Sequence, residues 1–136
     1  MNKSLQMTLL VALGSGLGGL ARVSLALAFS FSPPWGYLSA TLLANSAGCF
    51  LIGFLAAGFA QAPGPRSEAW QTFLLPGFCG GFTTVSLFSL QGLYLWQDGF
   101  YLSLFFYFAG SIVSCLLCVG IGWKLSPRRL TNHSQR

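Results

Sequence analysis

Residues 76–84, with the sequence PGFCGGFTT, stand in the middle of a long uncharged stretch where a membrane-spanning helix is expected. Three glycines and a proline within six residues disfavour an unbroken helix. Backbone that leaves the helix at membrane depth is tolerated only when it is buried in protein or lines a watery cavity. The hydroxyls of Thr83, Thr84 and Ser86 follow directly. We therefore expect the third span to break over Gly77–Thr84 and to offer carbonyls, amides and hydroxyls to an ion.

The composition of the whole chain is typical of a membrane protein. Charged residues make up 7% of it, against roughly 25% in an ordinary soluble domain. Uncharged runs of this length accommodate helices of about 20 residues, the length that spans a bilayer. The pattern predicts four membrane helices, at Leu5–Phe31, Trp35–Ala60, Ala69–Trp96 and Gly99–Leu125. We expect an all-α membrane protein with one transmembrane domain over residues 1–126 and a short basic polar tail over 127–136.

The net charge of +5 comes from residues that flank the predicted spans, which is the distribution of the positive-inside rule and not of a nucleic-acid-binding surface. With an even number of spans, both termini and the loop near residue 66 share one side of the membrane. The basic residues on that side include Lys3, Arg66, Lys124, Arg128 and Arg129. The opposite side has only Asp98. If the orientation is fixed, the bias predicts both termini in the cytoplasm.

Several function classes lack their required residues. No Asp or Glu lies within a predicted span, so an exporter that couples cation efflux to protons has no carboxylate to use. The chain shows no nucleophile–base pair, metal cluster or phosphate-binding loop, which argues against an enzyme. The four cysteines lie inside apolar segments, where cysteine usually behaves as a small apolar residue.

Polar residues within the predicted spans are few, and each is a candidate for function because an unpaired polar group is costly there. Thr41 and Asn45 lie four residues apart on one helix face; they could donate to a ligand or join helices by hydrogen bonds. Tyr107, Ser111 and Ser114 form a second polar stripe, for which bonding of the serines to their own helix is the alternative.

Arg22 is the single charge in the interior of a predicted span, since Lys124 lies at the end of the fourth one. It could extend to the membrane interface or raise the electrostatic potential for an anion in a vestibule. Hydrogen-bond donors, hydroxyls and one arginine, without an acid, favour an anion as the ligand of the interior.

Three motifs together resemble the CrcB/Fluc family of fluoride channels. They are Gly14-x-x-x-Gly18-x-x-Ala21-Arg22, Thr41-x-x-x-Asn45-x-x-Gly48 and the run over residues 77–84. The resemblance covers nearly the whole chain in the correct order. It implies a dual-topology dimer of two antiparallel copies, with a structural sodium ion at its centre and two fluoride pores. The implied function is passive export of fluoride across the cell inner (plasma) membrane, which relieves fluoride toxicity.

The resemblance also assigns roles by position. Backbone carbonyls of Gly80 and Thr83 would hold the sodium ion, and Arg22 would lie in the vestibule. The residues assigned to the fluoride pore are Asn45, Thr41, Phe88, Ser86, Thr84, Tyr107 and Ser111. A selective pore must replace the water around fluoride with close donors, to which the positive edge of an aromatic ring can add.

Two positions depart from the family pattern. Val85 stands where the first of two pore-facing phenylalanines is expected, and Gln91 stands where many relatives have glutamate. Together with the one-sided charge, Val85 leaves open a second interpretation. The chain could be one subunit of a heterodimeric channel, paired with an oppositely oriented paralogue, or a non-conducting scaffold. A small multidrug exporter is a more remote alternative, because it needs a membrane-embedded carboxylate.

Overall fold

The computed structural model describes residues 2–29, 36–61 and 64–127, and every described element is a helix. In chain order these are α1 (Lys3–Phe29), α2 (Gly36–Phe59), α3 (Pro65–Thr72), the π-helix η1 (Phe73–Cys79), α4 (Gly80–Phe82), α5 (Ser86–Gln97) and α6 (Tyr101–Leu125). Four helical stretches are long and apolar enough to cross a membrane. The prediction of an all-α protein with four spans is therefore confirmed. The predicted basic tail lies almost entirely outside the described residues.

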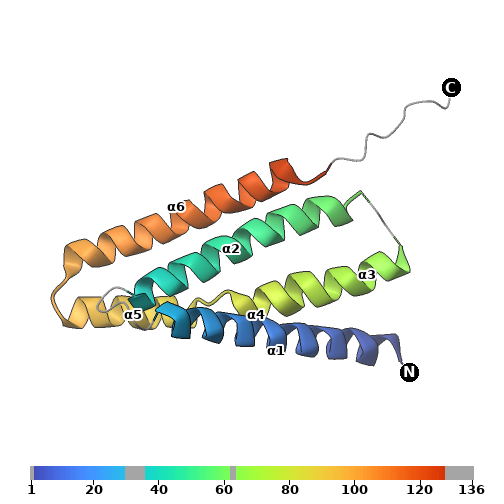
Figure 1. Ribbon diagram of the computed structural model, residues 1–136, viewed down its shortest axis with the longest axis horizontal. Coiled ribbons are helices and arrows are strands. Elements are labelled where there is room, and N and C mark those ends of the chain that lie inside the picture. Colours follow the sequence, from blue (N-terminus) through green and yellow to red (C-terminus); the bar gives the residue numbers. More distant parts are fainter. Residues whose placement is uncertain (1, 30–35, 62–63, 128–136) are drawn as a thin grey trace.

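The helices run side by side in an elongated bundle (Figure 1). The start of α1, the start of α3 and the end of α6 lie at one end, and the turn between α5 and α6 lies at the other. Helix α1 packs along η1 and α4, while α2 packs along α6. The third span thus runs past α1 in its first half and past α2 and α6 in its second half.

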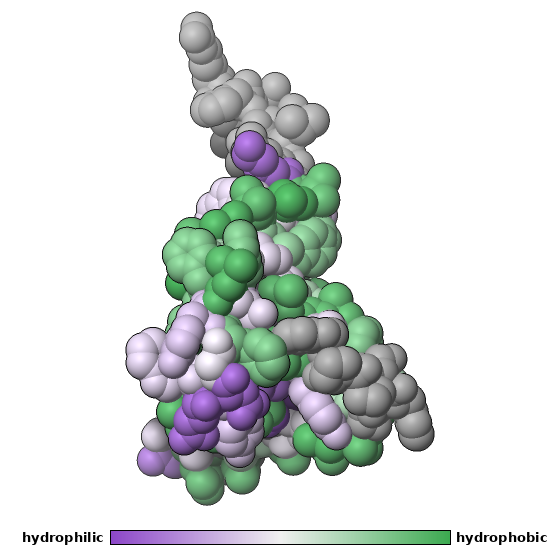
Figure 2. Space-filling model, turned by 90° about the vertical axis from the view of Figure 1, so that its left-hand side faces the viewer, coloured by the Kyte–Doolittle hydropathy of each residue, from purple (hydrophilic) through white to green (hydrophobic). Residues whose placement is uncertain are grey.

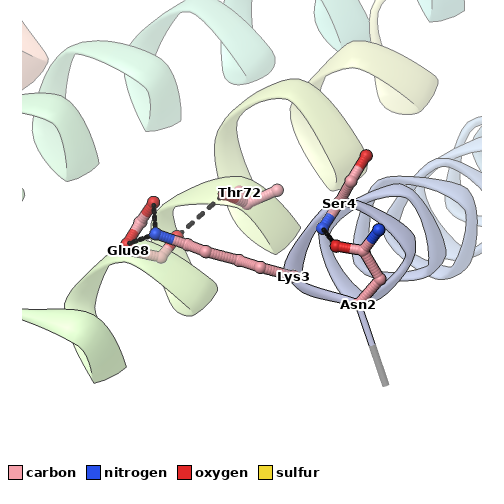
Figure 3. A network of polar contacts seen from close by, with 5 residues as sticks. All are labelled: Asn2, Lys3, Ser4, Glu68 and Thr72. Carbon is pink, nitrogen blue, oxygen red and sulfur yellow. Dashed lines mark hydrogen bonds and ion pairs between the residues drawn. The ribbon is translucent and has the colours of Figure 1, made fainter.

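An exposed ion pair joins α1 to α3 at the end of the bundle where the chain begins (Figure 3). The Lys3 Nζ lies 3.0 Å from each carboxylate oxygen of Glu68. Because the two side chains are 70% and 49% exposed, the pair stabilises the fold by about 0–1 kcal/mol. Its consequence is electrostatic: Glu68 offsets one of the positive charges at this end.

The opposite end of the bundle contains a tight turn between α5 and α6. Gly99 adopts a φ of 77°, a left-handed conformation that favours glycine. The Phe100 N–H donates to the Leu95 carbonyl at 2.8 Å, which closes the end of α5. Seen from this end, hydrophilic residues gather over one part of the surface and apolar residues cover much of the remainder (Figure 2).

Glycines bring α1 and the third span into backbone contact. A Cβ atom at Gly14 would overlap the Phe73 carbonyl oxygen, and one at Gly81 would overlap the Ser15 carbonyl oxygen. The Ser15 hydroxyl donates to the Gly77 carbonyl at 3.3 Å across the same contact. Small residues allow such close approach between membrane helices. These glycines therefore serve helix packing.

The third span breaks later in the chain than the sequence predicted. The segment from Gly77 to Phe82 stays helical, first as the end of a π-helix and then as α4. The chain leaves the helix at Thr83, whose ψ is 155°, and returns to helical angles at Val85. The prediction of a broken third helix is correct, but the glycine-rich part of the predicted segment, Gly77–Thr84, does not itself break. Two of its three glycines, Gly77 and Gly81, are accommodated by packing against α1.

Candidate ion site at the broken third span

The break exposes backbone groups that a continuous helix would pair. The last helical turn closes when the Thr83 N–H donates to the Cys79 carbonyl at 3.0 Å. Beyond it, within the part of the chain that the structure describes, no backbone amide donates to the carbonyl oxygens of Gly80 or Thr83. Gly80 is exposed, and a Cβ atom there would meet nothing within 4 Å. The two carbonyls assigned to sodium are thus free of backbone partners, and Gly80 lies at an open surface.

Asn45 on α2 clamps the break by two hydrogen bonds to one residue. The Thr84 N–H donates to the Asn45 Oδ1 at 2.7 Å. The Asn45 Nδ2 donates to the Thr84 carbonyl at 2.9 Å. Thr84 is buried, so these bonds replace both backbone bonds that the residue loses by leaving the helix. One N–H of the Asn45 amide remains for another acceptor, because the NH2 group has two donors.

The Thr84 hydroxyl accepts a hydrogen bond from the first turn of α5. Its Oγ1 accepts a hydrogen bond from the Leu87 N–H at 3.2 Å and lies 3.1 Å from the Ser86 Oγ. A side-chain oxygen that accepts from an amide in the first turn satisfies a donor that the helix cannot pair. Thr84 therefore both ends the break and starts α5.

An open hollow of about 370 Å³ lies beside the break. Its lining includes four of the residues assigned to the fluoride pore, namely Asn45, Thr84, Phe88 and Ser111. Among the described residues, no carboxylate lines it. The Val85 side chain is 76% exposed at its rim, so a single chain leaves the hollow open on one side.

Ser111 and Ser114 of the α6 stripe behave differently. The Ser111 side chain is 4% exposed, and its Oγ has no hydrogen-bond partner in the part of the chain that the structure describes. The Ser114 Oγ lies 2.7 Å from the Ser46 Oγ on α2. The alternative in which these serines bond to their own helix is therefore wrong for Ser114, which joins two helices. Ser111 presents an unpaired hydroxyl to the hollow.

Thr41 and Tyr107 meet at a different place, around Gln91. The Gln91 Nε2 donates to the Thr41 Oγ1 at 2.9 Å and to the Tyr37 carbonyl at 3.1 Å. The Tyr107 hydroxyl donates to the Gln91 Oε1 at 2.6 Å. Thr41 and Gln91 line a second hollow of about 620 Å³, which also includes Asp98. Of the residues assigned to the pore, Thr41 thus lines the second hollow, whereas Asn45, Thr84, Phe88 and Ser111 line the hollow at the break.

Phe88 lies between these two groups of residues. Its ring stacks on Phe108, with centroids 4.4 Å apart, and tilts against Tyr107 at 5.3 Å. These contacts restrain the ring, which also lines the hollow at the break. Ser86, by contrast, is exposed and does not line the hollow at the break.

Arg22 contacts the third span just before the break. Its Nε donates to the Gly81 carbonyl at 3.4 Å, in a partly buried position beside α4. The guanidinium therefore lies near the break and raises the electrostatic potential there; its place in a vestibule stays a prediction.

Sequence reasoning missed three residues of this region. Gln91 was noted only as a departure from the family, yet it connects Thr41 to Tyr107. Cys49 and Cys115 were taken as small apolar residues, yet both line the hollow. Their spacing was an available signal, since each lies four residues after a predicted pore residue on the same helix.

Comparisons with known proteins agree with the arrangement of these motifs. Residues 9–123 match the family model for CrcB-like protein, Camphor Resistance (CrcB). A protein of Chlorobium luteolum named fluoride-specific ion channel FluC is 47% identical over 116 residues, which cover 84% of this chain and 87% of the relative. A protein of the same name from Paramagnetospirillum magneticum is 42% identical over 118 residues, covering 83% and 89%. The chain therefore belongs to the family of CrcB-like proteins.

Proposed function

We propose that this chain forms a fluoride-specific channel, through which fluoride leaves the cytoplasm down its gradient and its toxicity is relieved. Relatives that match most of the chain carry the name of such a channel. The observation that carries the proposal is the hollow beside the break, which offers hydrogen-bond donors and no carboxylate. A site of this kind replaces the water around a small anion and repels no negative charge.

Three groups in the hollow can act on fluoride directly. The Asn45 amide keeps one N–H after it has bound Thr84. The Ser111 hydroxyl is buried without a partner, and an unpaired buried hydroxyl is costly unless a ligand uses it. The edge of Phe88 carries the positive part of the ring quadrupole. The Gln91 network on the second hollow continues this polar track toward Thr41 and Tyr107.

A second copy of the chain would complete the channel. The hollow is open at Val85, and the free carbonyls of Gly80 and Thr83 supply only two oxygens for a sodium ion. An antiparallel copy that met this one at Gly80 would bring two more oxygens to the same ion. The chemistry of the donors fits, because a hard cation binds oxygen ligands and the described carbonyls lack backbone donors. The bound ion would hold the two breaks together.

The proposal includes the membrane in which the chain lies and the side that its termini face. The spans make the chain a multi-pass membrane protein, and we assign it to the plasma membrane, where a fluoride exit pathway would act. The starts of α1 and α3 and the end of α6 lie at one end of the bundle (Figure 1), and these helix ends contain Lys3, Arg66 and Lys124. In a fixed orientation this end would face the cytoplasm.

A heterodimer is the second candidate, and one observation favours it. Val85 stands at the rim of the hollow with most of its side chain exposed, in the place of a pore-facing ring. An oppositely oriented paralogue could supply that ring. A multidrug exporter is disfavoured because no carboxylate of the described residues lines the hollow. A non-conducting scaffold is disfavoured because it would give no role to the hydrogen-bond donors in the hollow.

The test is transport by the purified chain alone. Liposomes that contain only this protein are loaded with fluoride or with chloride, and efflux is followed with ion-selective electrodes. We expect fluoride efflux well above protein-free liposomes and chloride efflux at background. If the chain alone gives no fluoride efflux, and co-reconstitution with an oppositely oriented paralogue restores it, the result supports the heterodimer. Equal efflux of both ions contradicts a fluoride-specific pore.

A further inference from the structure

Two cysteine thiols share the hollow with the proposed fluoride ligands. Cys49 lies on α2, four residues after Asn45, and Cys115 lies on α6, four residues after Ser111. Both line the hollow beside the break. Beside them on the same two helices, the Ser46 Oγ of α2 and the Ser114 Oγ of α6 lie 2.7 Å apart, three residues before Cys49 and one residue before Cys115. The two thiols are therefore a pair across the α2–α6 interface and not two isolated cysteines.

Close packing of the two helices explains why such short side chains meet. A Cβ atom at Gly53 on α2 would overlap the Val119 carbonyl oxygen of α6. A Cβ atom at Gly122 on α6 would overlap the Phe50 carbonyl oxygen of α2. The backbones are thus in direct contact one to two turns from the thiols. This fixed separation of the helices holds the thiol pair in place.

The pair has the ligand set of a soft-metal site. Thiolates select soft cations such as copper(I), whereas hard cations bind oxygen. Among the described residues, no group of three or more histidines, cysteines or carboxylates could hold a metal, so the site offers two ligands. Two thiolates suffice for the linear coordination of copper(I) or silver(I). We propose that Cys49 and Cys115 form a two-thiol binding site for a soft monovalent cation in the wall of the hollow.

Binding changes the charge of the hollow. Each thiol loses its proton to solvent as its sulfur binds the metal, so one cation and two neutral thiols give a complex of charge −1 and two protons. No electron is transferred. This negative charge forms in the same hollow as Asn45 and Ser111, where it repels an approaching anion. The metal therefore inhibits fluoride efflux, a consequence that rests on the ion path proposed above.

The first experiment measures binding and does not depend on transport. Silver nitrate is titrated into the full-length purified protein by calorimetry in chloride-free buffer. We expect one tight site per chain, with affinity reduced at least about 100-fold in Cys49→Ser and in Cys115→Ser. The matched control is Cys118→Ser, a thiol on the same helix that does not line the hollow, and it should bind silver as the wild type does. Cys49→Ala replaces Cys49→Ser if the serine variant does not fold. Wild-type affinity in the Cys49 and Cys115 variants overturns the proposal, as does absence of tight binding by the wild type.

The second experiment asks whether the site lies on the ion path. Fluoride efflux from chloride-free liposomes is measured before and after silver nitrate is added at a saturating concentration. We expect efflux to fall at least tenfold, to recover when dithiothreitol removes the metal, and to be insensitive to silver in Cys49→Ser. Cys118→Ser should remain sensitive. If silver binds the pair and efflux is unchanged, the thiol site stands and the placement of the fluoride path along this hollow is wrong.

Discussion

Replacement of Asn45 tests the clamp on the broken span and the fluoride path together. Asn45→Ala removes both hydrogen bonds to Thr84 and leaves a buried N–H and a buried carbonyl unpaired. Each unpaired group costs about 1–3 kcal/mol, or about 2–6 kcal/mol for the two. That is a large part of the 5–15 kcal/mol by which a typical domain is stable. Asn45→Asp keeps the oxygen that accepts from Thr84 and loses only the donor, so its cost is about 1–3 kcal/mol.

The two variants are distinguished by thermal unfolding and by fluoride efflux from liposomes. We expect Asn45→Ala to unfold at a clearly lower temperature. Asn45→Asp should remain assembled and yet lose fluoride efflux, because a carboxylate repels the ion and offers no donor. Ser46→Ala is the matched control, since the neighbouring Ser46 bonds to Ser114 and not to the break. An unfolding temperature unchanged in Asn45→Ala would refute the clamp, and normal efflux by Asn45→Asp would remove Asn45 from the ion path.

Three further substitutions probe other parts of the site. Val85→Phe should raise fluoride efflux, because it adds a positive ring edge at a position that is 76% exposed. A lower efflux in a well-folded variant would show that the missing ring does not limit the rate of fluoride efflux. Gly18→Ala places a Cβ against a carbonyl of η1 and should lower stability by about 1–3 kcal/mol in thermal unfolding, whereas Gly19→Ala, with nothing within 4 Å, should not. Ser111→Ala removes an unpaired buried hydroxyl, so stability should hold while efflux falls about tenfold; Ser114→Ala, which breaks a bond to α2, should instead lose about 0.5–1.5 kcal/mol of stability.

The four spans were predictable because uncharged runs of the right length have few alternatives in a membrane. The predicted second span, Trp35–Ala60, matches α2 at Gly36–Phe59, and the fourth ends at Leu125 as predicted. The third span was predicted to start at Ala69, but α3 begins at Pro65. A proline is well tolerated at the first position of a helix, so it marks a helix start here more than a loop.

The position of the break was harder to predict, because it is set by contacts between distant residues. Glycine is a poor helix former when exposed to water, and that property suggested a break at Gly77. In the bundle Gly77 and Gly81 lie against α1, where the absence of a side chain is favourable. Thr83 and Thr84 leave the helix instead, where Asn45, 39 residues earlier than Thr84, can pair the freed backbone. The residues next to Thr84 in the sequence do not indicate that Asn45 is its partner.

The clamp between Asn45 and Thr84 also has a consequence for biogenesis. Asn45 enters the bilayer with α2, before the ribosome has synthesised Thr84, 39 residues later. During that interval the Asn45 side chain cannot form its hydrogen bonds with the Thr84 backbone. Insertion of the individual spans must therefore precede formation of the break, which belongs to the later stage in which inserted helices pack together. A defect at this residue is expected to appear as correctly inserted but misassembled protein, which quality-control proteases in the membrane would remove.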